Sequence, residues 1–571
     1  MKLTSYAEGR WYEATDGFVP ILSAVDGHTV ALASSNGLDT AAMVRFAREV
    51  GGPNLRAMTF HERAAMLKSL ALYLNERKES LYALSFDTGA TSRDHLVDID
   101  GGIGTLFAYA SKGRRELPDE RFVIDGPEEP LSRSGTFVGR HLLTPLRGVA
   151  VHVNAYNFPC WGMLEKLACA LLAGVPAIVK PATATAYVAQ AAFAAIVRSG
   201  CVPPGAVQLI VGGTRDLLDH LGGQDVVAFT GSLPTSLVLR NHPGIAENAV
   251  RFVAERDSLN AAVLAPDAVP GTPEFDLFVR EVVREMTVKA GQKCTAIRRA
   301  LAPRATFAAA RDALVAALSE IVVGDPRRDG VDMGPLSSLV QRDDVRGRVA
   351  ELQSEATLAF GDPFFVIAEG GDAQRGAYLS PLLLTCERPL AATVIHTVEA
   401  FGPVCTLMAY DTLDDAIDIV RRGGGSLVAS IFTYDNATAN QLIMGLGSYH
   451  GRIIAIDRDD ARESTGHGSP LPALVHGGPG RAGGGEELGG MRGVCHYLQR
   501  TAVQGAPEGL AGLTHAWTRA AAEVARASHP FRQRFEELAI GETIQTATRT
   551  IALDDIEHFA AFTGDTFYAH M

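Results

Sequence analysis

Alternating strand-like and helix-like segments after Arg147 constrain the fold more than any other feature of this chain. Short apolar runs predict buried strands at residues 148–153, 176–180, 207–211 and 226–229. Longer periodic segments between them predict helices at residues 161–173 and 183–199, each followed by a glycine suited to a left-handed C-terminal cap. Such alternation favours a parallel, doubly wound sheet with right-handed crossovers, and therefore the α/β class.

Other segments extend this core. A second α/β region is expected from about Glu255 to Asp457, and a capping box at Thr59 predicts the start of an amphipathic helix. Residues 121–146 interrupt the alternation and predict a projecting strand or hairpin. Because such a hairpin can add a strand to a partner subunit, we expect a homo-oligomer, either a dimer or a trimer of dimers.

The C-terminal part is less regular. Residues 466–490 are rich in glycine, which is typical of a flexible linker, but the segment is long for a featureless loop inside a compact domain. We expect an ordered loop that closes over the functional site. Residues 504–509 are then expected to form a linker, with a helix at 511–527 and a different segment from about residue 531.

Composition limits the function classes. A chain of 571 residues should form several domains, and its net charge of −13 argues against non-specific nucleic-acid binding. The sequence has no uninterrupted apolar run of membrane-spanning length and no apolar signal segment at its start. Its seven scattered cysteines form no disulfide framework and no CxxC pair, so a cytoplasmic protein without a metal site is expected.

Three residues carry a candidate chemistry. Cys294 stands in Gly-Gln-Lys-Cys-Thr, Glu255 ends an apolar strand, and Asn157 stands in Tyr-Asn-Phe-Pro. A thiolate can add to an aldehyde carbonyl, an amide can hold the oxyanion, and a carboxylate can activate water to hydrolyse the resulting thioester.

Each of these residues also has an ordinary structural interpretation. An isolated cytosolic cysteine is usually a small buried hydrophobe, a carboxylate at a strand end is often a surface cap, and asparagine before proline commonly forms an Asx turn. The occurrence of Asn157, Glu255 and Cys294 together, in these contexts, favours the catalytic interpretation. Burial is expected to raise the pKa of Glu255 and so prepare it as a general base.

Several residues are candidates for a nucleotide site. Lys180 ends a predicted strand, where it can bond a ribose, and Gly231-Ser232 open a helix whose N–H groups can hold a phosphate. Glu399 and Phe401 stand in Glu-Ala-Phe-Gly-Pro, which can hold a nicotinamide ribose or form an ordinary loop. No GxGxxG follows a strand, so the usual dinucleotide fingerprint is absent.

Taken together, these motifs resemble the aldehyde dehydrogenase superfamily over about residues 1–503. The resemblance implies that fold, with a Rossmann-like cofactor domain, an α/β catalytic domain and an oligomerisation hairpin. It implies Cys294 as nucleophile, Glu255 as base, and Asn157 with the Cys294 backbone as oxyanion donors. It also implies Lys180 and Glu399 as ribose contacts and Gly231-Ser232 near the pyrophosphate.

Three departures from the family pattern bear on function, and one of them is the glycine loop around Pro479. The residues after Glu255 are Arg-Asp-Ser-Leu-Asn, where the family normally has Leu-Gly-Gly. Thr183 stands where many NAD-preferring members have a glutamate that binds the ribose 2′-hydroxyl. Without that carboxylate a 2′-phosphate meets no like-charge repulsion, so we expect NADP in preference to NAD.

The end of the chain resembles one branch of the family, the bifunctional ring-opening proteins of aerobic phenylacetate breakdown. These join an aldehyde dehydrogenase to a MaoC-like hot-dog hydratase that hydrolyses oxepin-CoA. The resemblance implies that Asp565 and His570 belong to the hydratase motif. The remaining segment is shorter than a domain normally needs, so we expect an incomplete hot-dog fragment in which the hydratase half is inactive.

These points predict the domains. Residues 1–120 and 147–254 form a cofactor-binding domain, 121–146 an oligomerisation hairpin, and 255–503 a catalytic domain with a C-terminal oligomerisation strand. Residues 504–530 form a linker and helix, and 531–571 a truncated hydratase fragment.

The expected activity is oxidation of a CoA-linked semialdehyde to the carboxylic acid, with a substrate of the 3-oxo-5,6-dehydrosuberoyl-CoA semialdehyde type. Two alternatives remain. One is the 3,4-dehydroadipyl-CoA semialdehyde dehydrogenase of aerobic benzoyl-CoA degradation, which would lack the hydratase tail. The other is a non-catalytic assembly scaffold.

Overall fold

The computed structural model describes the chain except residues 516–517, 519–520, 522–552 and 565–571. The chain divides into two compact units. The first comprises Met1–Val123 and Leu142–Thr501, and the second comprises Ile124–His141 and Ala502–Met571. Asp565 and His570, the candidate hydratase residues, lie outside the described residues.

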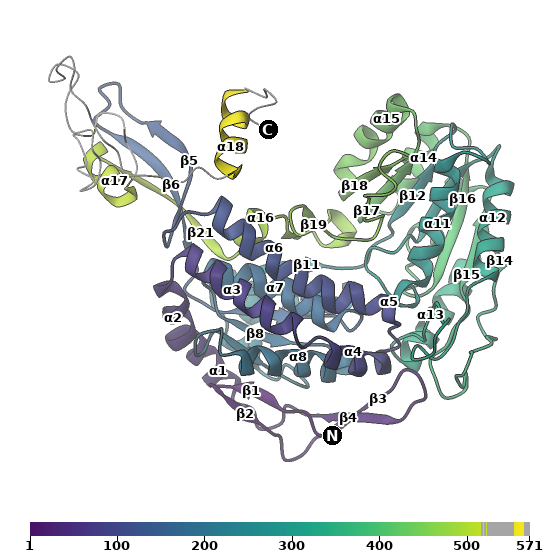
Figure 1. Cartoon of the computed structure of the whole chain (residues 1–571), viewed down its shortest axis with the longest axis horizontal. Coiled ribbons are helices and arrows are strands. Elements are labelled where there is room, and N and C mark those ends of the chain that lie inside the picture. Colours follow the sequence, from purple (N-terminus) through teal and green to yellow (C-terminus); the bar gives the residue numbers. More distant parts are fainter. Residues whose placement is uncertain (516–517, 519–520, 522–552, 565–571) are drawn as a thin grey trace. The chain divides into compact units, whose positions relative to one another are not determined.

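The first unit contains the sheet that the alternation predicts (Figure 1). Its order is β11-β10-β7-β8-β9-β1-β2, and the strands β7 to β11 are parallel to their neighbours. The bounds are β7 Ala150–Val153, β8 Ala177–Lys180, β9 Val207–Leu209, β10 Val226–Thr230, β11 Arg251–Glu255, and the antiparallel edge strands β1 Ser5–Ala7 and β2 Arg10–Tyr12. All four predicted strands are confirmed.

Chain order reverses between β7 and β10, which are neighbours in this sheet although β8 and β9 lie between them in sequence. In open α/β sheets, ligands bind at the carboxyl ends of the strands at such a switch point. The loops that follow β7 and β10 carry Asn157 and Gly231. The topology therefore brings these two sequence candidates to one edge of the sheet.

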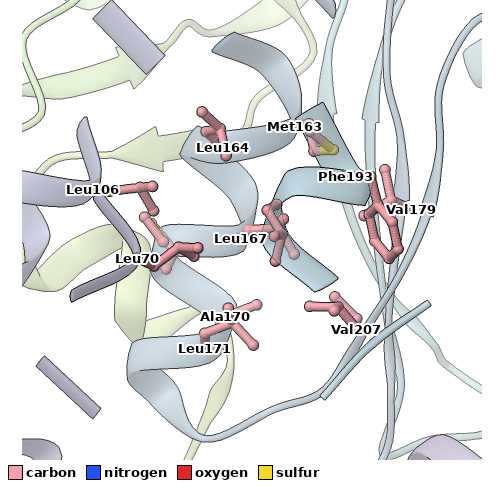
Figure 2. Packing of buried hydrophobic residues seen from close by; sticks show 14 of the residues in the cluster. Leu70, Leu106, Met163, Leu164, Leu167, Ala170, Leu171, Val179, Phe193 and Val207 are labelled. Carbon is pink, nitrogen blue, oxygen red and sulfur yellow. The ribbon is translucent and has the colours of Figure 1, made fainter. Parts of the chain in front are cut away.

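Helix α7 (Pro159–Ala173) forms the centre of the core beside this sheet. Figure 2 shows Leu167 and Met163 of α7 with Val179, Phe193 and Val207, while Leu70 and Leu106 lie on the other side of the helix. Proline at its first position is compatible with a helix start, so α7 begins two residues earlier than predicted. Helix α8 (Ala186–Ser199) begins three residues later, because Thr183–Thr185 forms a 3₁₀ turn.

The predicted caps hold as well. Gly174 and Gly200 adopt left-handed conformations after α7 and α8, and Thr59 and Glu62 form the capping box of α3. The remaining helices of this half are α1 Thr40–Phe46, α2 Gly52–Ala57, α3 Phe60–Asn75, α4 Glu79–Ser85, α5 Ser92–His95, α6 Gly101–Glu116, α9 Leu233–Arg240 and α10 Pro243–Ala246. Strands β3 (Val19–Leu22) and β4 (Thr29–Ala33) form a separate pair.

The second α/β region forms its own sheet, of order β14-β15-β16-β13-β12-β17-β18, drawn in teal and green in Figure 1. Only β14, at the edge, runs antiparallel to its neighbour. The strands are β12 Ala261–Leu264, β13 Arg299–Pro303, β14 Thr357–Phe360, β15 Leu382–Cys386, β16 Val404–Tyr410, β17 Ser426–Phe432 and β18 His450–Ile456. The helices are α11 Pro273–Thr287, α12 Phe307–Ser319, α13 Leu339–Leu352, α14 Leu413–Arg421 and α15 Asn436–Leu446.

The glycine-dense segment is ordered, as predicted. Strands β19 (Val475–Gly477) and β20 (Glu486–Leu488) pair antiparallel around a 3₁₀ turn at Gly480–Ala482, and α16 (Met491–Cys495) follows. Gly483 has a φ of 114°, and a Cβ there would lie 2.1 Å from the carbonyl oxygen of Ala254. Glycine is therefore required where the segment passes against β11.

The hairpin predicted at 121–146 is present as β5 (Val123–Pro130) and β6 (Val138–Pro145), in a three-stranded sheet with β21 (Leu498–Gly505). The expected linker at 504–509 is wrong. Strand β21 continues to Gly505, and helix α17 (Pro507–Thr514) starts with a proline at its first position and an acidic first turn, both of which favour a helix N-terminus.

Helix α17 ends at Thr514, earlier than the helix predicted at 511–527, most of whose remaining residues lie outside the described part. Helix α18 (Leu553–Thr563) is the described part of the expected hydratase fragment. Within the described residues, no helix has both the length and the apolar character needed to cross a lipid bilayer.

Candidate active site

Two adjoining cavities in the first unit collect the sequence candidates. The larger, of about 750 Å³, is called the cofactor cavity below, and the smaller, of about 50 Å³, is called the inner cavity. Asn157, Glu255 and Cys294 line both cavities. The three predicted catalytic residues therefore meet at the boundary between a large and a small space.

The turn before Cys294 has an uncommon backbone conformation. Lys289 and Ala290 have φ values of 52° and 50°, and Gly291 follows with a φ of 66°. A left-handed non-glycine residue costs roughly 1–2 kcal/mol, so the surroundings must hold this turn. The backbone N–H of Lys289 donates to Asp94 at 2.8 Å, and its ammonium donates to the carbonyl and hydroxyl of Thr88, each at 2.7 Å.

Side chains from neighbouring strands fix the loop that carries the nucleophile. Asn260 donates to the carbonyl of Cys294 at 2.8 Å. Arg298, which is buried, donates to the carbonyls of Gly291 at 2.8 Å and Lys293 at 3.2 Å. The backbone N–H of Cys294 makes no hydrogen bond with the described residues, so it remains available to an oxyanion.

A histidine that sequence reasoning missed lies against the base. Nε2 of His476, on β19, is 2.8 Å from Oε2 of Glu255, and both side chains are almost fully buried. Donor atoms of Glu255, Cys294 and His476 all lie within 4.8 Å of one another. The closing glycine segment thus supplies a side chain to the site.

This histidine reverses one expectation. Burial raises the pKa of Glu255, but the charge of His476 and hydrogen bonds from His476 and the Cys294 thiol outweigh burial, so the pKa lies below its ordinary value. The expected elevated pKa is therefore wrong. The carboxylate is therefore ionised at neutral pH, which is the form that a general base requires.

The Cys294 thiol is affected in the opposite direction. Burial raises the pKa of Cys294 well above its ordinary value, and the negative charge of Glu255 raises it further, while Lys293 lowers it. The resting residue is therefore a thiol, and an additional positive charge nearby would favour the reactive thiolate.

Asn157 meets the requirements of an oxyanion donor. Its side chain is buried, faces both cavities and makes no hydrogen bond with the described residues. Nearby Asn154, which lines the cofactor cavity, also has both side-chain polar atoms buried without a partner among these residues. Buried amides normally find partners, so these groups indicate a site that receives a polar ligand.

The predicted nucleotide contacts gather in the cofactor cavity with one exception. Lys180, Gly231, Ser232, Glu399 and Phe401 all line it. Burial lowers the pKa of Lys180. Ala182 also lines the cavity, but Thr183 is not part of its lining.

Glu399 and Phe401 are held by Arg298, the same residue that fixes the nucleophile loop. The Glu399 carboxylate lies 3.5 Å from the guanidinium, whose centre lies 5.2 Å from the Phe401 ring centroid. Burial raises the pKa of Glu399 to about 7, and its Oε1 has no hydrogen-bond partner among the described residues. Glu399 lines the cofactor cavity, where its carboxylate can accept from a ribose hydroxyl, and the cavity is large enough for a dinucleotide.

The departure after Glu255 also has a structural reason. The backbone N–H of Arg256 donates to Ala482, and its guanidinium donates to Gly480, both in the glycine segment. Asp257 accepts from the N–H of Leu233 at the start of α9. These residues therefore fasten the closing segment and a cavity helix.

Sequence reasoning missed His476, Asn260 and Arg298. A histidine beside the glycine run, and an asparagine and arginine close to the two strongest motifs, were the available signals. None of them forms a recognisable pattern by itself, because their roles depend on contacts between distant segments.

The comparison with a family model decides the classification. The model of the aldehyde dehydrogenase family matches residues 11–500. The chain belongs to the aldehyde dehydrogenase family. The match spans all the residues of both cavities, so the α/β fold and the enzyme class expected from the motifs are confirmed.

Two curated relatives are the most informative about the substrate. The 3,4-dehydroadipyl-CoA semialdehyde dehydrogenase of Aromatoleum evansii is 45% identical over 84% of this chain and 93% of its own length. Protein MaoC of Klebsiella aerogenes is 46% identical over 42% of this chain and 70% of its own length. Among aldehyde dehydrogenases, this chain is thus similar to one with a CoA-linked substrate in its name.

Solved structures agree on the fold. Lactaldehyde dehydrogenase from Escherichia coli matches with a TM-score of 0.76 at 22% identity, covering 88% of this chain and 99% of that one. Betaine aldehyde dehydrogenase from Staphylococcus aureus in complex with NAD⁺ gives the same TM-score and identity, covering 88% and 94%. At this identity the likeness establishes the aldehyde dehydrogenase fold alone.

Proposed function

We propose that this protein oxidises a CoA-linked semialdehyde of the 3,4-dehydroadipyl-CoA type to the carboxylic acid, with NADP as the electron acceptor. The observation that carries the chemistry is the cluster of Cys294, Glu255 and His476 beside the free amide of Asn157. The 45% identical relative supports the substrate class. The cluster also argues against a non-catalytic scaffold, which would need none of these groups.

Acylation begins at Cys294. Its thiol must lose a proton to solvent before attack; the charge of Lys293 favours this loss, and the charge of Glu255 opposes it. When bound in the cofactor cavity, a nicotinamide dinucleotide supplies the hydride acceptor and a positive charge. The thiolate adds to the aldehyde carbonyl, and the oxyanion lies between the Asn157 amide and the Cys294 backbone N–H. Loss of hydride from the former aldehyde carbon leaves a thioester on Cys294.

Deacylation uses Glu255. The carboxylate takes a proton from water, and the resulting hydroxide attacks the thioester carbon. The C–S bond breaks, the free acid leaves, and the sulfur is protonated again. His476 acts as a positioning residue in this step, because its contact at 2.8 Å holds Glu255 in place and keeps it ionised.

NADP is proposed over NAD from the lack of a carboxylate at Thr183. Lys180, three residues earlier, lines the cofactor cavity and can contact the ribose or its phosphate. Apart from the linker at 504–509, the domain boundaries given above, a homo-oligomer formed through the hairpin, and the cytoplasmic location remain predictions.

A second candidate function is supported by the similarity to Protein MaoC and by the tail motif at Asp565 and His570. In that case the substrate is the 3-oxo-5,6-dehydrosuberoyl-CoA semialdehyde expected from the sequence. The dehydroadipyl substrate is preferred to this one because the dehydroadipyl-CoA semialdehyde dehydrogenase covers twice the share of this chain that Protein MaoC covers.

A substrate panel tests the proposal. Steady-state assays with NADP and with NAD should compare both CoA-linked semialdehydes, their CoA-free counterparts and a short free aldehyde. We expect the highest kcat/KM for 3,4-dehydroadipyl-CoA semialdehyde with NADP. Equal kcat/KM for the CoA-linked and CoA-free substrates would refute the substrate class, and higher kcat/KM with NAD would refute the cofactor assignment.

A further inference from the structure

A third cavity adjoins the inner cavity and has no role in the chemistry described so far. It is open to solvent, has a volume of about 700 Å³ and is called the outer cavity below. Helices α5, α11 and α12 and the turn at Leu96–Asp100 contribute its lining. Val97 lines both the outer and the inner cavity, so the outer cavity lies next to the space around Cys294.

Arg284 also lies between the outer and the inner cavity. Arg284, in the lining of the outer cavity, donates to the carbonyl of Thr465 at 3.2 Å. A Cβ on Gly466 would lie 2.5 Å from the guanidinium, so the chain passes directly against it. The same segment then supplies Gly468 and Pro470 to the inner cavity. Arg284 therefore lies beside the wall that separates the two cavities.

The outer cavity combines an apolar wall with arginine side chains. Leu96 is 61% exposed there although it is a large hydrophobe. The apolar lining comprises Leu96, Val97, Phe275, Val279, Val283, Val288, Ala313, Ala317 and Ile321, and the arginines are Arg93, Arg280 and Arg284. Helix α11 lines the cavity as far as Thr287, over about 16 Å from Asp276, which suits an extended flexible ligand.

Two of the arginines have donors to spare. The side chain of Arg280 is 58% exposed, and its contact with Glu281 is 3.8 Å long. Arg93 is 77% exposed and lies 3.5 Å from Asp332. Neither guanidinium makes a hydrogen bond with the described residues. Exposed pairs of this kind are weak, whereas a guanidinium binds a phosphate through two parallel hydrogen bonds.

Aspartates also line the outer cavity, and they narrow the choice of ligand. Asp94 is buried and bonded to backbone N–H groups, Asp332 faces Arg93, and Asp276 is exposed. Three arginines and three aspartates give no net positive field, which disfavours a polyanion such as nucleic acid. The lining suits a ligand that carries a few phosphates on an otherwise apolar or neutral body.

We propose that the outer cavity binds the CoA moiety of the substrate. Arg93 and Arg280 contact the phosphates, and the apolar wall takes the adenine and the pantetheine arm; Arg284 is already bonded to Thr465 and Glu281. The acyl chain passes Val97 into the inner cavity and places the aldehyde at Cys294. This inference rests on the proposed function, since only a CoA-linked substrate needs such a site.

Selective loss of CoA-linked substrate tests this assignment. The double variant Arg93→Ala/Arg280→Ala should be assayed with 3,4-dehydroadipyl-CoA semialdehyde and with a short free aldehyde. We expect kcat/KM for the CoA substrate to fall at least about tenfold relative to the free aldehyde, mostly through KM. Arg311→Ala, on α12 but outside the cavity lining, is the matched control and should leave this ratio unchanged.

Inhibition by free CoA gives a second readout. CoA should compete with the CoA-linked substrate in the wild-type protein, and the double variant should need about tenfold more CoA. If the wild type prefers free aldehydes, the proposed function fails. If the wild type uses the CoA substrate but the double variant keeps both its kcat/KM ratio and its CoA inhibition, the proposed function stands and the outer cavity is not the CoA site. If the double variant changes the oligomeric state but neither the kcat/KM ratio nor the inhibition by CoA, the assignment is also overturned.

Discussion

Glu255 and Cys294 each shift the pKa of the other. The carboxylate raises the pKa of the thiol, and the thiol hydrogen bond helps to lower the pKa of the carboxylate. In the resting site the stable state is therefore carboxylate and thiol. Transfer of the thiol proton to Glu255 is therefore uphill in the resting site, so Glu255 does not generate the thiolate there.

This charge relation predicts how Cys294 reacts with an alkylating reagent. Because Glu255→Gln removes the negative charge, the pKa of the thiol should fall and iodoacetamide should alkylate Cys294 faster at neutral pH. The pH profile of alkylation should shift toward lower pH. Glu165→Gln should produce a smaller shift in the same direction, since its charge contributes less. Slower alkylation of Glu255→Gln at every pH would contradict this account.

A second prediction concerns His476. Its removal leaves burial as the main influence on Glu255, so the pKa of the carboxylate should rise in His476→Ala. A carboxylate with a raised pKa is protonated at higher pH. The acid limb of the kcat–pH profile should therefore move toward neutral pH, and kcat should fall.

His476→Gln, which keeps a hydrogen-bond donor without the charge, should show an intermediate shift of the same limb. A merely structural role for His476 would lower kcat without moving the profile. If the acid limb lies at the same pH in the wild type, His476→Ala and His476→Gln, His476 is not a positioning residue for Glu255.

At the scale of elements, the glycine-rich segment at 466–490 packs closely against β11 because residue 483 is a glycine. Ala at position 483 would meet the carbonyl of Ala254 and would also adopt an unfavourable φ. Gly483→Ala should therefore displace the segment that carries His476, lowering both the melting temperature and kcat. Gly484 has a φ of 77° but nothing near a Cβ, so Gly484→Ala should cost only about 1 kcal/mol and keep kcat.

Thermal unfolding and steady-state assays of these two variants make the comparison. Equal effects of the two substitutions would show that contact with β11 is unimportant. Loss of stability in Gly483→Ala without loss of kcat would show that the segment does not position the base.

The sequence predicts elements that depend on local residue patterns, and it does not predict contacts between distant segments. The strands around Ala150 and Val226 were predictable, because buried parallel strands are short apolar runs between glycines and helices. Cys294, Glu255 and Asn157 each lie in a recognisable motif next to such an element. The pairing of His476 with Glu255 was not predictable, because it depends on the path of the chain through the 220 residues between them.

The failed expectations have the same origin. The linker at 504–509 has a linker-like composition, yet Gly505 completes a strand paired within a sheet and Pro507 starts a helix. The pKa of Glu255 was expected to rise because burial is readable from the apolar strand, whereas the partner that lowers it is not. Local composition describes local preference, and tertiary contacts override it.

At the scale of the whole molecule, three neighbouring cavities of the first unit share lining residues. Val97 joins the outer to the inner cavity, and Cys294 joins the inner to the cofactor cavity. Substrate and cofactor thus reach the sulfur from different sides.

The central claim is that Cys294 carries the acyl group during turnover. The direct measurement is intact-mass spectrometry, with rapid-quench detection of NADPH, on Glu255→Gln mixed with the CoA-linked semialdehyde and NADP. The account predicts a burst of about one NADPH per active site and an acyl adduct that maps to Cys294 and hydrolyses slowly. Turnover of Glu255→Gln at the wild-type rate, or an adduct on another side chain, would contradict it.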